Sequence, residues 1–156
     1  MKTETAFWDT SALVPLCCHQ PASAEARHVA RRYGRMVVWW CTRVEAYGAL
    51  ARLRREGSLS ENGFQQTVAR LSLLSRAWLE VLPAESVRQR AEELLALQII
   101  RAADALQLAA ALVWCQGRPQ RRVFVCFDQR LASAAAQTGF EVKGVRGGRL
   151  VEGLRL

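Results

Sequence analysis

Short apolar runs alternate with longer amphipathic segments along almost the whole chain, and this alternation restricts its fold more than any other feature. The run Met36–Trp40 (MVVWW) contains no polar residue, as expected for a strand that is covered on both faces. Ser60–Trp78, in contrast, carries its apolar residues at the three-to-four-residue spacing of a helix. Strands that alternate with helices join through right-handed crossovers into a mostly parallel sheet. We therefore predict an α/β fold, a three-layer α/β/α sandwich with a mostly parallel central sheet.

The same pattern predicts the order of the elements. Strands are expected at Thr5–Trp8, Met36–Trp40, Leu79–Leu82, Val123–Phe127 and Glu141–Val145. Helices are expected between the first strand and Leu16 and at Ser23–Tyr33, Thr42–Arg55, Ser60–Trp78, Ala84–Leu97, Arg101–Cys115 and Gln129–Gln137. No repeat, low-complexity segment or linker divides the 156 residues, so we expect a single domain, 1–156, around one core.

Composition bears on the compartment and on metal binding. No apolar run reaches the length of a membrane span, and the segment before Phe7 is too short and polar for a signal peptide, so we expect a cytoplasmic protein. The five cysteines form no CxxC pair, which argues against a disulfide framework or a zinc finger. Cys17, Cys18 and His19 are consecutive and would point in different directions on a helix, so free thiols are expected there rather than a zinc site.

The net charge of +8 comes almost entirely from arginine, with 20 arginines against 2 lysines. The arginines gather in three clusters, RHVARRYGR at 27–35, RLRR at 52–55 and RPQRR at 118–122. The planar guanidinium suits phosphate, so these clusters are compatible with a polyanionic partner. Solvated helix faces would give the same pattern, and charge alone does not decide between the two.

Acidic residues follow the predicted strands at the points where a parallel sheet binds its ligands. Asp9 comes directly after the first strand, Asp128 directly after the fourth, and Glu45 one turn after the second. Ligands of such sheets bind beyond the carboxyl ends of the strands. Capping explains the same residues in another way, because Asp9 and Asp128 fit N-caps and Glu45 fits a capping box with Thr42.

Asp104 lies in a segment that is apolar almost all round, and such a helix should be largely buried. A buried carboxylate needs a partner. Arg101 and Gln107, three residues away on either side, are candidate partners, and the alternative is a cleft that holds a metal ion. Mg²⁺ or Mn²⁺ would relieve the repulsion among converging carboxylates and activate a water molecule for attack on a phosphodiester.

Four segments of the chain resemble the acidic motifs of the PIN-domain family, in the order in which that family has them. They are FWDTSALVPL, TRVEAYGAL, IIRAADALQLAAAL and VFVCFDQRL. Within the family the sequence most resembles the VapC-like toxins of bacterial and archaeal toxin–antitoxin pairs. The resemblance runs from about Phe7 to Leu131, and the last predicted strand also fits.

This resemblance implies an Mg²⁺- or Mn²⁺-dependent RNA endonuclease that forms a homodimer and is inhibited by a cognate antitoxin. The acids of the family are matched one by one by Asp9, Glu45, Asp104 and Asp128. Asp9 and Asp104 are expected as principal metal ligands, with the other two acids completing the site. Ser11 matches the hydroxyl of the DxS motif, close to metal waters or phosphate. Ser60–Trp78 is the candidate for part of the dimer interface, because it is long and has a well-defined apolar face.

The sequence departs from the family at Cys126, where Ser or Thr often precedes the last acid by two residues. A thiol donates a weaker hydrogen bond than a hydroxyl. A non-catalytic PIN-like module that binds RNA or protein is therefore the main alternative, although the presence of all four acids argues against it. A DNA-directed nuclease is also compatible, because the metal chemistry does not need a 2′-hydroxyl.

Two further interpretations concern single residue types. A phosphoacceptor receiver domain would have paired acids after the first strand and a lysine at the end of a late strand, whereas here Asp9 stands alone and Lys143 lies within the last strand. Trp39, Trp40 and Trp78 are candidates for base stacking, but the adjacent pair on a buried strand favours core or dimer contacts.

Overall fold

A computed structural model describes residues 2–145 of the protein, and five strands with seven helices lie within them. The two ends of the predicted domain, residue 1 and residues 146–156, lie outside the described residues. The strands are β1 (Thr5–Trp8), β2 (Arg35–Trp39), β3 (Leu79–Val81), β4 (Val123–Cys126) and β5 (Glu141–Gly144). The helices are α1 (Thr10–Cys17), α2 (Ser23–Arg32), α3 (Thr42–Arg55), α4 (Glu61–Ala77), α5 (Glu85–Leu97), α6 (Ala102–Trp114) and α7 (Gln129–Thr138). Every predicted element is confirmed, with its ends within one residue of the prediction.

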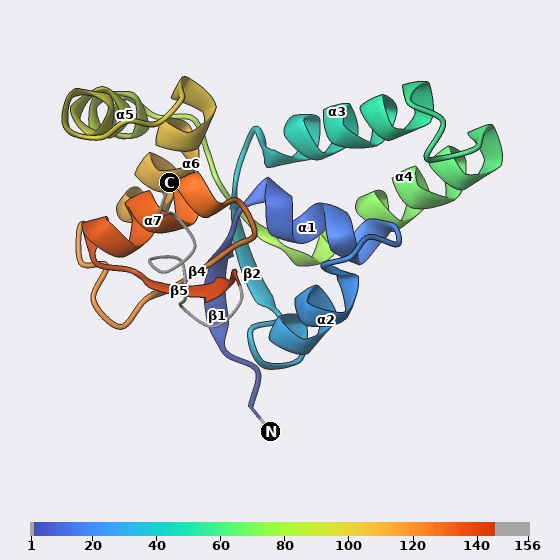
Figure 1. Ribbon diagram of the computed structural model, residues 1–156. Helices are drawn as coiled ribbons and strands as arrows, with labels where there is room; N and C mark the ends of the chain where they lie inside the picture. Colours follow the sequence, from blue (N-terminus) through green and yellow to red (C-terminus); the bar gives the residue numbers. More distant parts are fainter. Residues whose placement is uncertain (1, 146–156) are drawn as a thin grey trace, which may run out of the picture.

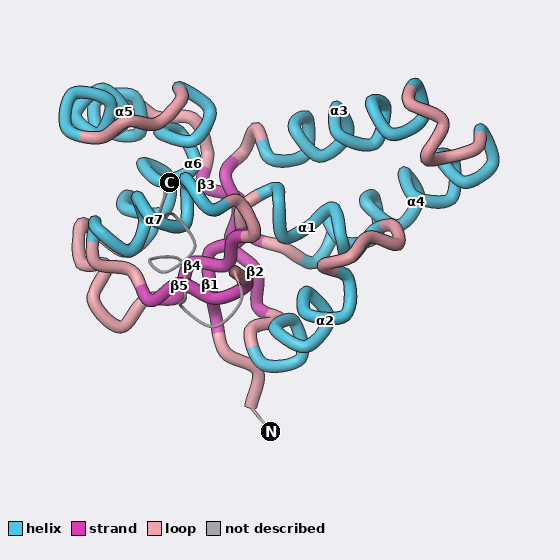
Figure 2. The backbone as a smooth tube through the Cα atoms, viewed as in Figure 1, coloured by secondary structure: helices cyan, strands magenta, loops and turns pink. Residues whose placement is uncertain are grey.

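The strands form one sheet in the order β3-β2-β1-β4-β5, and every pairing among them is parallel. The helices lie on both faces of this sheet, as Figures 1 and 2 show, so the predicted α/β/α sandwich is confirmed. Helices α1 to α4 cover one face and α5 to α7 cover the other.

Successive side chains of a strand point to opposite faces of the sheet, so each strand contributes to the core on both faces. On β1, Phe7 packs with the helices α5 to α7, whereas Trp8 packs with α1 to α4, and both side chains are fully buried. Phe7 stacks on Phe124 of β4 with ring centroids 5.3 Å apart. Burial on both faces is why these strands read as continuous apolar runs.

The apolar face of α4 is used inside the chain. Phe64 and Leu71 are buried in the core cluster that also contains residues of α1 and α3. The expectation that Ser60–Trp78 supplies a dimer interface through this face is therefore wrong in its reasoning, because the face already has an intramolecular partner. Among the tryptophans, Trp39 and Trp78 are buried and Trp40 is 49% exposed.

None of the helices between residues 2 and 145 combines the length and the apolar character that crossing a bilayer requires.

Candidate active site

The four acids singled out in the sequence lie at the starts of four different helices. Asp9 directly follows β1 and caps α1, and Asp128 follows β4 by one residue and caps α7. Glu45 lies in the first turn of α3, and Asp104 lies in the first turn of α6. Helix N-termini carry partial positive charge, so each of these places favours a carboxylate.

Asp9 is held most rigidly, because Ser11 binds it twice. Its Oδ2 accepts hydrogen bonds from the Ser11 backbone N–H at 3.0 Å and from the Ser11 hydroxyl at 2.5 Å. The Ser11 oxygen in turn accepts a hydrogen bond from the Phe127 backbone N–H at 2.9 Å, which ties α1 to the end of β4. The side chain of Asp9 is only 5% exposed. Burial, together with the negative charges of Glu45 and Asp128, raises its pKa to about 6, although the Ser11 hydrogen bonds oppose the rise.

Glu45 is bound by two polar side chains from other helices. Its Oε2 accepts hydrogen bonds from the Thr10 hydroxyl at 2.9 Å and from the Gln107 amide at 3.2 Å. Burial, with a contribution from the charge of Asp104, raises the pKa of Glu45, and the two hydrogen bonds oppose the rise. The proposed capping box is wrong, because the Glu45 carboxylate faces these side chains while Cys41 occupies the N-cap of α3.

Asp104 is half-buried and accepts a hydrogen bond at 3.4 Å from the backbone N–H of Arg101. Burial, with the charge of Asp128, raises its pKa, while Arg130 and Arg101 counteract the rise. Gln107 is not its partner, contrary to one expectation, because the Gln107 amide points to Glu45, to Thr10 at 3.1 Å and to Thr42 at 2.9 Å.

Cys126 contacts Asp9 rather than the carboxylate of Asp128. Its thiol lies 3.8 Å from Asp9 Oδ2 and 3.6 Å from the Ser11 hydroxyl, and it donates to the backbone carbonyl of Asp128 at 3.2 Å. Burial, with the charge of Asp9, raises the pKa of Cys126 well above its usual range, so the sulfur is a neutral thiol. The Asp128 carboxylate is instead held by the Leu131 backbone N–H at 2.9 Å.

The hydrogen bonds of the described residues engage only one oxygen of each acid. They reach Asp9 Oδ2, Glu45 Oε2, Asp104 Oδ2 and Asp128 Oδ1. Each carboxylate is thus held by one oxygen, and its other oxygen has no hydrogen-bond partner among the described residues. The four charges also repel one another in a chain, Glu45 with Asp9, Asp9 with Asp128, Asp128 with Asp104 and Asp104 with Glu45.

This donor set fits a hard divalent cation. Mg²⁺ prefers carboxylate oxygens, keeps several of its waters and needs only one or two protein carboxylates as direct ligands. Between residues 2 and 145 no three acidic, histidine or cysteine side chains converge closely enough to hold an ion together. The arrangement therefore suits an ion bound directly by a pair of acids and through water by the others.

Three polar residues of the site were absent from the predicted set: Thr10, Thr42 and, as a partner of Glu45, Gln107. Gln107 is 1% exposed within an apolar helix, so its burial signals a specific partner. Nothing in the sequence says which neighbouring element supplies that partner.

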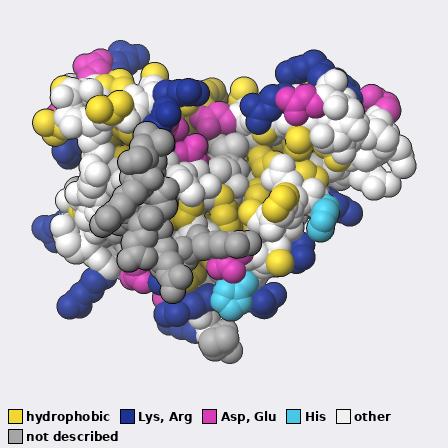
Figure 3. Space-filling model, in the orientation of Figure 1, with side chains coloured by type: hydrophobic (Ala, Val, Ile, Leu, Met, Phe, Trp, Pro, Cys, Tyr) yellow, Lys and Arg dark blue, Asp and Glu magenta, His cyan; other side chains and the backbone are white. Residues whose placement is uncertain are grey.

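Acidic and basic side chains occupy different parts of the surface on this face of the molecule. Figure 3 shows acidic side chains in the middle of this face, in the hollow between the two groups of helices, with basic side chains on both sides. A strand of nucleic acid crossing this face would meet basic groups before and after the acidic centre.

The fold is shared with several solved structures. VapC20 of Mycobacterium tuberculosis, a sarcin–ricin loop cleaving toxin, matches with a TM-score of 0.60 and 18% sequence identity, covering 83% of this chain and 95% of that protein. A toxin–antitoxin complex from Klebsiella pneumoniae matches with a TM-score of 0.58 and 14% identity, over 81% and 88% of the two chains. A protein from Pyrobaculum aerophilum matches with a TM-score of 0.54 and 20% identity, over 89% of each. No model of a protein family and no curated protein sequence matches the chain.

Proposed function

We propose that this protein is a metal-dependent RNA endonuclease, the toxin of a toxin–antitoxin pair. One observation carries the proposal: four carboxylates from four helices lie close enough for their charges to contribute to the raised pKa values of Asp9, Glu45 and Asp104, and each has one oxygen that accepts no hydrogen bond from the described residues. Helix capping alone does not require these charges to act on one another, and like charges that do so destabilise a fold.

In the proposed site Asp9 and Asp104 are the principal ligands of Mg²⁺ or Mn²⁺, and Asp128 completes the set through water. When bound, the ion would polarise the phosphoryl oxygen and lower the pKa of the attacking water. Ser11 keeps Asp9 in a single orientation through its two hydrogen bonds. Arg101 and Arg130, whose charges already act on Asp104, are placed to meet the substrate phosphate.

Glu45 has the geometry of a general base in this scheme. Thr10 and Gln107 both bind its Oε2, which leaves Oε1 to accept a proton from the attacking water. A carboxylate whose pKa is raised by burial is a stronger base than an exposed one. The water gives a proton to Glu45 as its oxygen attacks phosphorus, the bond between phosphorus and the 3′-oxygen breaks, and the 3′-oxygen takes a proton from solvent. The products carry a 5′-phosphate and a 3′-hydroxyl.

Several parts of the proposal rest on the solved structures with the same fold. The neighbour from M. tuberculosis cleaves the sarcin–ricin loop and the neighbour from K. pneumoniae is a toxin–antitoxin complex, which favours an RNA substrate and an antitoxin partner. A homodimer and a cytoplasmic location complete the proposal. The alternative of a non-catalytic PIN-like module is disfavoured by the free carboxylate oxygens, for which a binding module has no use.

Cleavage assays test the proposal. The protein is incubated with single-stranded and structured RNAs in Mg²⁺, Mn²⁺ or EDTA, beside the Asp9→Asn variant. We expect cleavage with either metal, none in EDTA and none by the variant. Cleavage that persists in EDTA, or that survives Asp9→Asn, contradicts the metal mechanism. Absence of cleavage of any RNA with metal present supports the non-catalytic alternative.

A further inference from the structure

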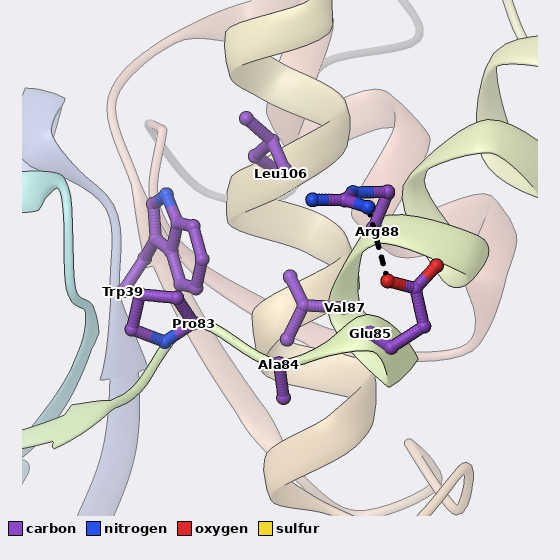
Figure 4. Close-up of a pocket in the computed structure, with 7 residues that line it drawn as sticks. All are labelled: Trp39, Pro83, Ala84, Glu85, Val87, Arg88 and Leu106. Carbon is purple, nitrogen blue, oxygen red and sulfur yellow. Dashed lines mark hydrogen bonds and ion pairs between the residues drawn. The ribbon is translucent and has the colours of Figure 1, made fainter.

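A pocket of about 410 Å³ opens near the ends of β2 and β3 (Figure 4). Its lining comes from the end of β2, the loop before α5, the first turn of α5 and α6, through Trp39, Pro83, Ala84, Glu85, Val87, Arg88 and Leu106. This volume lies within the range of about 300–1,000 Å³ that small-molecule sites occupy. No part of the proposed cleavage mechanism uses these residues.

The sheet register places this pocket next to the acids. Val37 pairs with Phe7, so Trp39, two residues further along β2, lies level with Asp9, which follows β1. Neighbouring strands are about 4.8 Å apart. Leu106 lies about half a turn from Asp104 on α6, and so on another face of that helix, and Glu45 lies in the first turn of α3, which follows β2. The pocket thus lies at the same carboxyl edge of the sheet as the four acids, on the β3 side, although none of the four acids lines it.

The lining has the chemistry of a nucleobase site. The Trp39 ring forms one wall, with Pro83, Val87 and Leu106 as further apolar walls. The guanidinium of Arg88 extends from α5 towards the same space and pairs with Glu85 at 3.1 Å, as Figure 4 shows. The base faces of RNA stack on aromatic rings and guanidinium planes, while their edges need donors and acceptors such as this ion pair.

Trp39 also carries an unused donor. The ring is 5% exposed, and its Nε1–H has no hydrogen-bond acceptor among residues 2–145. The Cys41 thiol lies beside the ring, but sulfur is a weak acceptor. A buried donor without a strong acceptor costs stability, and this donor belongs to a residue that lines the pocket.

We infer that this pocket binds one unstacked nucleobase of the RNA substrate and so positions the neighbouring phosphodiester over the carboxylates. The inference rests on the proposed nuclease function and adds to it the feature of the RNA that is recognised. A phosphate is a poorer occupant than a base, because Glu85 already neutralises Arg88 and the other walls are apolar.

Binding measurements in the Asp9→Asn background, which keeps the RNA intact, test the inference. The probes are fluorescein-labelled heptamers of A, C, G or U and an abasic heptamer with the same phosphates, followed by fluorescence anisotropy with Mg²⁺ present. At least one base-bearing heptamer should bind about five- to a hundredfold more tightly than the abasic one, the range of a stacked base. Equal binding of all five probes overturns the inference.

Two further substitutions, each with a control, test whether this pocket distinguishes the base-bearing heptamers from the abasic one. Arg88→Ala removes an exposed side chain, and its matched control is Arg90→Ala, on the same helix and likewise paired with a glutamate, Glu93, at 3.2 Å. Leu106→Trp fills the pocket, and Leu95→Trp adds the same ring on the exposed side of α5. We expect Arg88→Ala and Leu106→Trp to bind the base-bearing and abasic heptamers equally, whereas the two control variants keep the preference for a base. Equal behaviour within both pairs overturns the inference.

The same experiment keeps this inference apart from the proposed function. If the wild type cuts RNA in a metal-dependent way while the pocket variants behave as their controls, the nuclease stands and the base pocket falls. If base discrimination depends on the pocket but the wild type cuts no RNA, the pocket stands and the nuclease falls. If Arg88→Ala impairs only the binding of an antitoxin, the pocket is a protein contact and the inference is wrong.

Discussion

Burial of the Asp9 carboxylate lowers the stability of the fold when the group is charged, although the proposed metal site needs a carboxylate there. Its pKa of about 6 lies above the ordinary value of 3.8, because desolvation and two neighbouring acids disfavour its charge. The folded state therefore binds a proton at Asp9 more tightly than the unfolded chain does. Protonation of Asp9 therefore stabilises the folded state, fully below about pH 4, and this stabilisation is lost as the pH rises through 6.

Replacing Asp9 by asparagine should accordingly stabilise the metal-free protein at high pH. Asparagine keeps the cap on α1 but carries no charge. At about 1.4 kcal/mol for each pH unit between the two pKa values, the gain at pH 8 has an upper limit of about 3 kcal/mol and should vanish near pH 4. Urea unfolding in EDTA at both pH values measures the difference. A variant that is less stable than the wild type at pH 8 would show that the charge of Asp9 is compensated within the fold.

Gln107 joins three helices at the site through one buried amide. Its nitrogen contacts Thr10 of α1 and both Thr42 and Glu45 of α3, while its own helix is α6. This amide helps to keep Oε2 of Glu45 occupied and Oε1 free. Its role in the proposed mechanism is to position the base.

Gln107→Leu should impair both stability and cleavage. Loss of the donor leaves buried oxygens unpaired, at a cost of about 1–3 kcal/mol in the free energy of unfolding. The kcat for RNA should fall more than KM changes, because Glu45 acts in the chemical step. Gln98→Leu is the control, since it removes a hydrogen bond of 3.1 Å to Thr138 that involves no acid. Equal kcat values for the two variants would argue against a positioning role for Gln107.

At the scale of the elements, the strands and helices follow from apolar periodicity alone, whereas the partners of the acids do not. The sequence offered a capping box for Glu45 and the side chains of Arg101 and Gln107 for Asp104, yet Asp104 accepts the backbone N–H of Arg101 and Glu45 binds side chains of two other helices. Capping is a local relation that the sequence displays. The partners of Glu45 lie 35 and 62 residues away, and only the packing of α1 and α6 beside α3 brings them close.

Helix α7 offers a way to separate capping from chemistry. Asp128 accepts the Leu131 backbone N–H at 2.9 Å, and asparagine can do the same. Asp128→Asn should therefore keep the stability of the wild type within a few tenths of a kcal/mol, whereas Asp128→Ala should lose about 1 kcal/mol. Both should lose RNA cleavage. Thermal unfolding and a cleavage assay on the pair check this, and an active Asp128→Asn would reduce Asp128 to a helix cap.

At the scale of the whole molecule, the face drawn in Figure 3 has basic side chains on both sides of an acidic group. In the proposed function, the net charge of +8 would attract RNA from a distance, and the acids with a bound metal would define the point of cleavage. The sequence predicted the excess of arginine and the acidic residues separately. Their arrangement, with Arg101 and Arg130 acting on Asp104, required the folded chain.

Binding of single-stranded RNA should therefore weaken steeply with salt. About three to five phosphate contacts predict a fall of about 20- to 100-fold between 50 and 200 mM salt. Removing the exposed Arg130 should lower the slope of log K against log salt by about 0.7. Anisotropy titrations at several salt concentrations measure both slopes. A salt-independent affinity would mean that the arginines serve only as solvated surface.

The central claim is that the four carboxylates direct water, activated by a divalent metal, at the phosphorus of an RNA bond. Cleavage in ¹⁸O-labelled water with Mn²⁺, followed by mass spectrometry of the products, tests it most directly. Hydrolysis by metal-activated water predicts one ¹⁸O atom in the 5′-phosphate of the downstream fragment, an unlabelled 3′-hydroxyl upstream, and no product in EDTA. A 2′,3′-cyclic phosphate, or cleavage that needs no metal, would contradict it.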